Sequence, residues 1–160
     1  MPARLGHGAC RTASLCAVAE QTHSSIDIAA DPSEIMAVIA DVEAYPEWIS
    51  GLENVVMHDA DEQGRPLEAT FQGNLGLIKD SYTVAYDWAD TEVSWWLTRG
   101  DALRDLQGTY ACTDLGDGST RVEYRLHVDL AIPVVSMLRR RGEKVIIDSA
   151  LKGLKQRVES

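Results

Sequence analysis

The stretch Thr120–Leu130 most constrains the fold of this 160-residue chain, because apolar and polar side chains alternate along it without a break. Its apolar positions are Val122, Tyr124, Leu126, Val128 and Leu130. Successive side chains of an extended strand point to opposite faces of a sheet. Such alternation is typical of an antiparallel sheet with water on one face and a cover on the other. The rest of the chain must therefore provide that cover.

The C-terminal segment is the obvious cover, because good helix formers follow Pro133 through Ser160, interrupted only by Gly142 and Gly153. This length predicts a helix of about seven turns. Its apolar residues form two stripes: Val134, Leu138 and Val145 early, then Ile147, Leu151, Leu154 and Val158. Two explanations for the shift between the stripes stay open: a kink at Gly142 and a change of packing partner along the helix.

The N-terminal half predicts a strand and then a helix. Ser25–Ala30 alternates like a half-buried strand, and Asp31 is an N-cap candidate for a helix from Pro32 to about Val42. Pro46 ends this pattern, and Trp48, Ile49 and Leu52 should belong to a short second helix or a turn. Six further strands are predicted over Asn54–Asp59, Leu67–Gly73, Lys79–Trp88, Glu92–Thr98, Leu103–Thr113 and Thr120–Leu130. Because their connections are short, neighbouring strands should be antiparallel, in an α+β fold.

Composition excludes several classes of function. The chain is 45% apolar, enough for one core, and its formal net charge of −10 disfavours nucleic acid as a partner. No apolar run approaches the ~18 residues that cross a bilayer, so we expect a soluble cytoplasmic protein without stable membrane insertion. Arg139, Arg140 and Arg141 are interpreted as a solvated face, with transient contact to lipid head groups as the alternative.

Three cysteines give an odd count with no CxxC pair, which argues against a disulfide framework or a zinc site. Cys112 lies in a predicted strand and is interpreted as a small buried hydrophobic residue, with Cys10 and Cys16 near the N-terminus. The cysteine pattern therefore fits a reducing compartment.

Residues 1–24 lack helical or strand periodicity, and we expect a disordered N-terminal extension there. A secretory signal is the alternative, although its apolar stretch, Ala13–Ala19, is short and interrupted. Val18 is a hypothetical start for a shorter native chain, so residues 1–18 need not be native.

Three segments resemble the START-like superfamily, also called the helix-grip or SRPBCC group, of the polyketide cyclase/dehydrase and lipid transport type. They are Ile26–Trp48, with its Asp-Pro helix start and Tyr-Pro-Glu-Trp ending, Leu103–Tyr110, and Thr120–Leu130 after a Gly-Asp-Gly turn. Coenzyme Q-binding proteins share this pattern, and the resemblance covers residues 25–160. It implies a curved antiparallel sheet of about seven strands wrapped round a long C-terminal helix, with one or two short helices after the first strand. It also implies a hydrophobic ligand between sheet and helix.

The candidate ligand-binding residues are the apolar strand face and the early part of the C-terminal helix. They are Met57, Phe71, Tyr82, Val84, Tyr86, Trp95, Tyr110, Tyr124 and Leu126, joined by Met137, Leu138 and Val145. Simple core packing is the alternative for each of them. Tyrosine and tryptophan stand out, because a buried ring with a polar tip needs a partner that could be a ligand. Trp48 either gates the pocket mouth or plugs the space beside the first helix.

Asp80, Tyr82 and Tyr110 are weak candidates for proton transfer. Asp80 shares a strand face with Tyr82, and Arg104 with Tyr110, so either charged group could reach the pocket from a strand end. The alternative is that both charges lie at the surface. His58 and His127 should point to the wet face, and no motif for a metal, a cofactor or a nucleophile is present.

Two functions follow from these patterns. The first is a carrier or sequestering protein for a lipid, quinone or polyketide-like molecule, which needs only the pocket. The second is an aromatase/cyclase-type enzyme acting on a polyketide, which needs polar groups inside it. We favour the binder, because no convincing acid–base pair is present. A protein-interaction module is disfavoured by the acidic balance, and the oligomeric state is left open.

Overall fold

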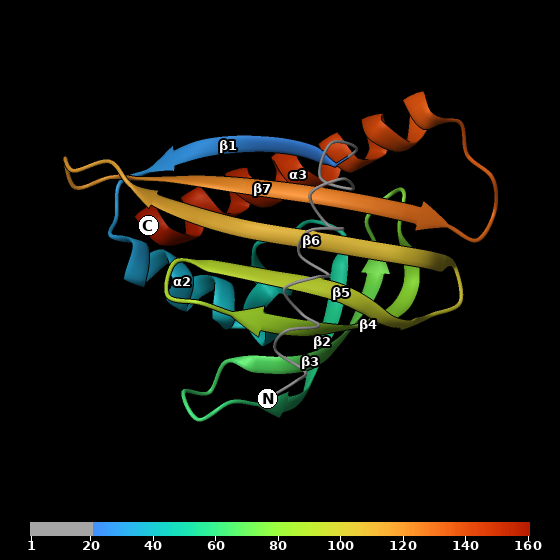
Figure 1. The fold of residues 1–160 in the computed structure, drawn as a ribbon, viewed down its shortest axis with the longest axis horizontal. Helices are drawn as coiled ribbons and strands as arrows, with labels where there is room; N and C mark the ends of the chain where they lie inside the picture. The colour runs from blue at the N-terminus through green and yellow to red at the C-terminus, as the bar shows by residue number, and fades with distance from the viewer. Residues whose placement is uncertain (1–20) are drawn as a thin grey trace, which may run out of the picture.

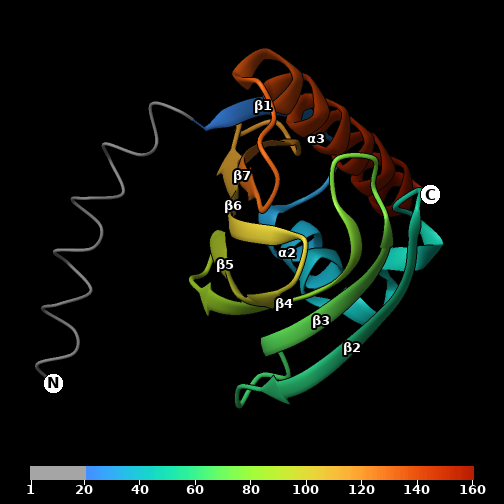
Figure 2. The same ribbon diagram turned by 90° about the vertical axis from the view of Figure 1, so that its right-hand side faces the viewer.

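The computed structural model describes residues 21–160, apart from the side chain of Asp80. Seven strands form one antiparallel sheet in the order β1-β7-β6-β5-β4-β3-β2, and three helices complete the described fold (Figure 1). The elements are β1 (Thr22–Ile28), α2 (Pro32–Ala40), the 3₁₀ helix η1 (Val42–Glu47), β2 (Leu52–Ala60), β3 (Pro66–Asn74), β4 (Lys79–Trp88), β5 (Glu92–Gly100), β6 (Leu103–Asp114), β7 (Thr120–Leu130) and α3 (Ser136–Glu159). The sheet curls so that α3 lies across its open side, next to β1 (Figure 2).

The predicted architecture is confirmed, and several element boundaries shift by a few residues, most consequentially at the start of β1 and after α2. β1 begins at Thr22, before the predicted Ser25, because His23 and Ser24 pair with Arg125 and Tyr124 of β7. Residues 22–24, expected in the N-terminal extension, therefore belong to the sheet. The expectations for residues 1–20, including Cys10 and Cys16, lie outside the described residues.

The second difference is the segment after α2. The predicted helix to about Val42 ends at Ala40, and η1 follows at Val42–Glu47 with Pro46 inside it. The tighter 3₁₀ turn accommodates the proline that was expected to end the helical pattern. Trp48 was expected in a short second helix or in a turn. It lies in a turn, where it is the C-cap of η1 and precedes β2.

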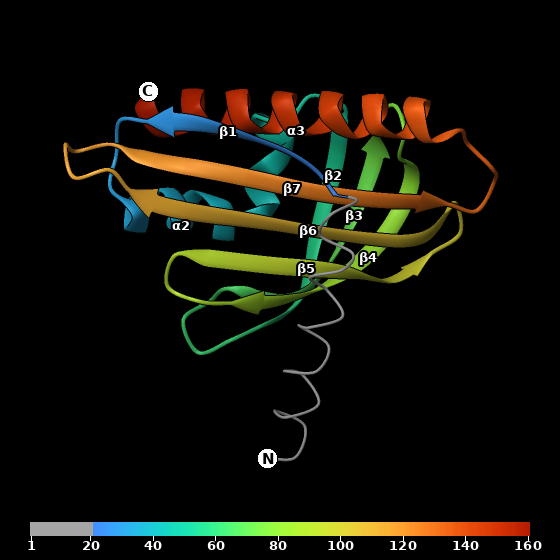
Figure 3. The same cartoon turned by 45° about the horizontal axis from the view of Figure 1, so that its top comes forward.

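α3 is one continuous helix, straight in Figure 3, so the predicted stripe shift does not come from a kink at Gly142. Its buried side chains recur at steps of three and four residues: Glu143, Ile146, Ile147, Ala150, Leu151 and Leu154. The predicted early stripe is wrong, since Leu138 and Val145 are exposed. Glu143, which was not in the predicted stripe, is the buried residue in this part of the helix.

Glu143 is fully buried at the edge of the sheet. Its carboxylate accepts hydrogen bonds from the Val128 backbone N–H at 2.7 Å, the Thr22 hydroxyl at 2.5 Å and the Arg139 guanidinium at 3.1 Å. The β1–β7 ladder begins at Thr22↔Leu126, so the Val128 amide lies beyond the first residue of β1. Because a buried N–H needs a partner, Glu143 supplies the acceptor that a longer β1 would have given.

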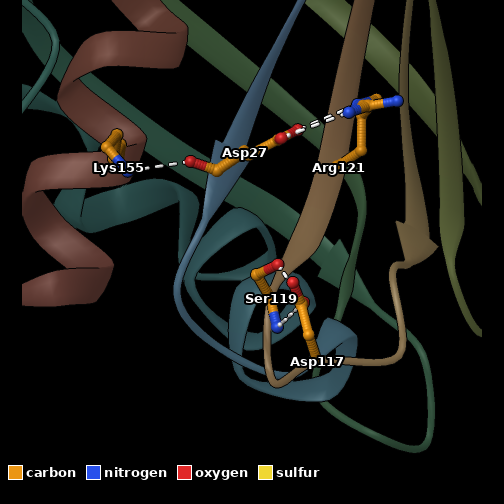
Figure 4. A network of polar contacts seen from close by, with 5 residues as sticks. All are labelled: Asp27, Asp117, Ser119, Arg121 and Lys155. Atoms are coloured by element: carbon orange, nitrogen blue, oxygen red, sulfur yellow. Dashed lines mark hydrogen bonds and ion pairs between the residues drawn. The ribbon is translucent and has the colours of Figure 1, made fainter.

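A second set of contacts holds the other half of α3 to β1 (Figure 4). Lys155 donates to the backbone carbonyl of Asp27 at 2.8 Å, and the Asp27 carboxylate accepts two hydrogen bonds from Arg121 of β7. Within the turn before β7, Asp117 accepts the Ser119 backbone N–H at 3.1 Å. Of these contacts only the Lys155 hydrogen bond involves α3, whereas the exposed Asp27–Arg121 ion pair joins β1 to β7 and contributes little stability.

Gly153 allows α3 to approach the end of η1 closely. A Cβ atom at this position would lie 2.3 Å from the backbone oxygen of Trp48, inside any normal contact distance. The glycine that reads as a helix breaker in the sequence is therefore a packing requirement.

We predict that Glu143→Ala lowers the free energy of unfolding by about 3 kcal/mol, because it leaves a mostly buried arginine and a buried amide without their acceptor. Chemical denaturation measures this loss. Asp148→Ala is the matched control on the same helix, since it removes the exposed Lys144–Asp148 pair and should cost less than about 0.5 kcal/mol. Equal losses in the two variants would contradict the role given to Glu143.

Candidate functional site

The concave face of the sheet and α3 enclose a space that we call the core pocket. Its lining residues are Tyr45, Ile49, Leu52, Phe71, Leu75, Tyr82, Val84, Tyr86, Trp95, Tyr110, Tyr124, Ile146 and Ala150. All five tyrosines of the chain are among them. None of these lining residues is charged at neutral pH. The pocket is therefore an aromatic chamber whose polar groups are phenol hydroxyls and an indole N–H.

Strand register brings the rings of the core pocket together. Phe71 pairs with Tyr82 across β3 and β4, and their rings stack at 5.5 Å between centroids with an interplanar angle of 12°. Tyr110 pairs with Tyr124 across β6 and β7, and these centroids lie 4.6 Å apart. Directly opposed residues share a face of the sheet, so the pairing itself aims these rings inward.

Trp95 completes the aromatic wall because Gly108 leaves room for it. The indole lies over the glycine opposite it on β6, where a Cβ atom would be 2.3 Å from ring atoms of Trp95. The centroid of the Trp95 ring then lies 5.4 Å from that of Tyr110 and 5.7 Å from that of Tyr124. Gly108 could not be recognised from the sequence, because a glycine in a strand does not reveal which ring covers it.

The tyrosine hydroxyls fall into two groups. Tyr45 donates to the backbone carbonyl of Ile39, which fixes η1 against α2. In the described residues, no protein group hydrogen-bonds the hydroxyls of the other four tyrosines, Tyr82, Tyr86, Tyr110 and Tyr124. Burial raises the pKa of each of these four phenols, so they stay protonated at neutral pH.

The core pocket is small in this structure, with a cavity volume of about 60 Å³. Sites for drug-sized ligands are on the order of 300–1,000 Å³. A ligand of that size therefore enters only if side chains or helices of the lining move. The strand walls are held by backbone ladders, whereas η1 and the middle of α3 are held by side-chain packing.

Seven predicted ligand-binding residues line the core pocket: Phe71, Tyr82, Val84, Tyr86, Trp95, Tyr110 and Tyr124. Leu126 belongs to the core beneath it, with 1% of its surface exposed. Trp48 packs edge-on against Tyr45 at 4.9 Å and does not line the pocket, which fits the plug interpretation. Its indole Nε1 is buried without a hydrogen-bond partner among the described residues.

The prediction that Arg104 could reach the pocket is wrong, because a bulge breaks the alternation of β6. The register shifts between Leu103 and Asp105, so Leu103 and Leu106, three residues apart, both point inward. Arg104 is exposed, and its guanidinium donates to the carbonyl of Ala131 at 3.4 Å. The charge of Arg104 therefore lies at the surface, as the alternative interpretation of the sequence had it.

Three predicted helix residues also lie elsewhere. Met137, Leu138 and Val145 are exposed to 68%, 54% and 61%. Ile146 and Ala150 line the pocket in their place.

Met57 lines a different hollow, which we call the outer groove. It lies between α2, the turn from β2 to β3 and the turn from β4 to β5, and its volume is about 410 Å³. Asp41, Glu43 and Asp90 line it, and Arg65 sits 5.7 Å from the centroid of the Trp88 ring. Although larger, this groove is more open and bears charges, so we regard the core pocket as the candidate site.

The structure offers little support for proton-transfer groups. The side chain of Asp80 lies outside the described part of the chain, so its role stays a prediction, as do those of Tyr82 and Tyr110. His58 is exposed, and His127 is half-buried beside Arg139 at 3.2 Å. Cys112 is buried, which raises its pKa to about 11.

Over residues 21–160, no group of three His, Cys, Asp or Glu side chains could hold a metal ion. No helix in this part of the chain is long and apolar enough to span a membrane.

Comparison with known proteins gives a consistent result. The family model described as polyketide cyclase/dehydrase and lipid transport matches residues 19–159. A START superfamily protein from Mycobacterium smegmatis has a TM-score of 0.80 and 20% identity, over 87% of this chain and 97% of that one. The Zhui aromatase/cyclase from Streptomyces sp. R1128 has a TM-score of 0.71 and 11% identity, over 87% and 93%.

A third similar structure is the STAR-related lipid transfer protein from Xanthomonas axonopodis, with a TM-score of 0.65 and 14% identity, over 86% of this chain and 85% of that fragment. At these identities the structures establish a shared fold. No curated protein matches the chain.

We predict that Gly108→Ala destabilises the protein by about 1–3 kcal/mol, because the new methyl group must displace the Trp95 indole. Thermal or chemical unfolding measures the loss. Gly100→Ala on β5 is the matched control, since its Cβ would meet no atom nearer than 3.3 Å and should cost less. A Gly108→Ala protein as stable as the control would show that Trp95 does not lie over Gly108.

Proposed function

Because the chain belongs to the polyketide cyclase/dehydrase and lipid transport family, we propose that it binds a hydrophobic small molecule in the core pocket, as a carrier or sequestering protein. The observation that carries this proposal is the composition of the pocket lining. Aromatic and aliphatic side chains surround the cavity, and the described lining contains no charged group. Pockets for small molecules are typically apolar with a few polar groups that orient the ligand.

The gain from binding comes from apolar surface that leaves water. Transfer of apolar surface contributes roughly 25 cal/mol per Å². Part of this gain is spent on enlarging the cavity from its present 60 Å³. Ile146 and Ala150 of α3 line the pocket together with Tyr45 and Ile49, and none of these four belongs to a strand ladder. Movement of the segments that carry these four residues would enlarge the pocket without breaking hydrogen bonds of the sheet.

Catalysis of polyketide cyclisation is the second candidate, and similarity to an aromatase/cyclase supports it. Protonated tyrosines could orient a substrate carbonyl by hydrogen bonds. A general base is a separate requirement, and burial raises the tyrosine pKa values, which disfavours the tyrosinate form. The described lining thus supports holding a molecule better than removing a proton from it.

We expect gently purified protein to carry an apolar small molecule, which native mass spectrometry detects and solvent extraction identifies. Ala150→Leu should reduce the bound fraction several-fold, because it fills part of the cavity. Lys152→Leu is the control, since it places the same side chain on the exposed face of the same helix, outside the lining, and should keep the adduct.

Failure to find an adduct, together with no thermal stabilisation by lipids, quinones or aromatic polyketides, would overturn the binding proposal. Product analysis with the same polyketides separates carrier from catalyst. Turnover that Tyr82→Phe, Tyr110→Phe or Asp80→Asn cuts about a hundredfold, with binding retained, would favour the cyclase instead.

A further inference from the structure

The outer groove has the size of a binding site, and the proposed function gives it no role. Its volume of about 410 Å³ lies within the range of small-molecule sites, on the order of 300–1,000 Å³. No described residue lines both this groove and the core pocket. A molecule in the outer groove would therefore occupy a second site, formed by α2 and by the β2–β3 and β4–β5 turns on the left of Figure 1.

Part of the lining of the outer groove is apolar and held in place. Met36 is buried, with 8% of its surface exposed, and Met57 and Trp88 are half-buried. The indole N–H of Trp88 donates to the backbone carbonyl of Pro66 at 2.6 Å, and its ring stacks on Tyr86 at 5.6 Å between centroids. A ligand therefore meets a preformed apolar surface in this groove.

The charged groups of the same lining are mostly acidic. Asp41, Glu43 and Asp90 are exposed there, against a single cation, Arg65. That cation is already engaged, because Arg65 Nε donates to the Asp61 carboxylate at 2.7 Å. Neither Asp41 nor Asp90 makes a side-chain hydrogen bond or ion pair with another described residue. The groove therefore has an excess of negative charge.

Glu43 also keeps capacity for a ligand. Its Oε2 accepts the backbone N–H of Met57 at a long 3.3 Å, and its Oε1 has no partner over residues 21–160. The carboxylates of the groove are too far apart to form a metal site, since no three acidic, His or Cys side chains of the described chain are grouped closely enough to hold a metal ion. An organic cation, which is larger and partly apolar, suits separated carboxylates around an apolar surface.

We propose that the outer groove binds a free organic cation, namely a protonated amine carried on an apolar body. The ammonium group hydrogen-bonds to the carboxylates of Asp41, Glu43 and Asp90, and the apolar body covers Met57 and Trp88. The net charge of −10 on the chain favours the approach of a cation and repels an anion of the same shape. This site is independent of the ligand proposed for the core pocket.

Three probes that share a naphthalene ring test this inference: the cationic 2-(1-naphthyl)ethylamine, the neutral 2-(1-naphthyl)ethanol and the anionic 3-(1-naphthyl)propionate. NMR of the full chain, labelled with ¹³C at methionine methyls and tyrosine rings, reports on the two sites separately, because Met36 and Met57 line the outer groove and every tyrosine lines the core pocket. At low salt the amine should shift both methyl signals with an affinity at least about fivefold tighter than the alcohol. The propionate should leave them unchanged.

Charge-neutralising variants assign the preference to the carboxylates. Asp41→Asn/Asp90→Asn should lower the affinity for the amine several-fold and leave that for the alcohol unchanged, because the amides keep the size and lose the charge. Glu53→Gln/Asp101→Asn is the matched control, since it changes the net charge equally at exposed positions outside the lining, and it should stay within about twofold of the wild type. If the first variant fails to fold, Glu43→Gln provides a second test, because its amide oxygen can accept the same backbone N–H.

Three results would overturn the inference. The first is equal affinity of the amine and the alcohol at the two methionines, or methyl shifts caused by the propionate. The second is an equal loss of amine affinity in Asp41→Asn/Asp90→Asn and in its control, because net charge alone would then explain the binding. The third is a set of amine-induced shifts confined to the tyrosine rings. Each of these results leaves the proposed function untouched, because the two sites share no described lining residue.

Discussion

The hydrogen bonds of the Glu143 carboxylate are the contacts on which the packing of α3 against the sheet depends. A curved sheet with one apolar face needs α3 to cover it, and the amide of Val128 lies beyond the described β1–β7 ladder, which begins at Thr22↔Leu126. Glu143 bonds that amide, Thr22 of β1 and Arg139 of its own helix. One fully buried charge thus joins three elements at one point, and its removal would leave several groups unpaired at once.

The side of α3 that carries the buried Glu143 also carries the residues that face the pocket. With Glu143 at the sheet edge, Ile146 and Ala150 close the aromatic chamber, and the exposed residues Met137, Leu138 and Val145 turn to the outside. Gly153 lets the far end of α3 touch the end of η1, so the helix is held near both ends. The middle of α3, which carries Ile146 and Ala150, is therefore the part of the helix that we propose moves when a ligand binds. The two ends of α3 thus hold the helix on the fold, and its middle lines the pocket.

Much of the fold could be predicted from sequence, because strict alternation and turn residues report strand faces directly. The strand faces of Phe71, Tyr82 and Tyr124 were predicted correctly for this reason. That of Arg104 was not, since a bulge changes the alternation without a distinct residue signal. The buried face of α3 was predicted wrongly in its early part, because a buried glutamate reads as a solvent position and only tertiary contacts reveal its partners. Tyr45 was missed because its role depends on a backbone carbonyl of α2, which a loop sequence does not show.

The central claim, that ligands enter the tyrosine-lined core pocket, is tested most directly by NMR of protein labelled with ¹³C at tyrosine rings and methionine methyls. Every tyrosine of the chain lines the core pocket, whereas Met36 and Met57 line the outer groove. Addition of 2,7-dihydroxynaphthalene should shift the ring signals of Tyr82, Tyr110 and Tyr124 and leave the methyl signals of both methionines unchanged. Shifts confined to Met36 and Met57, with unperturbed tyrosine rings, would contradict the account and place binding in the outer groove.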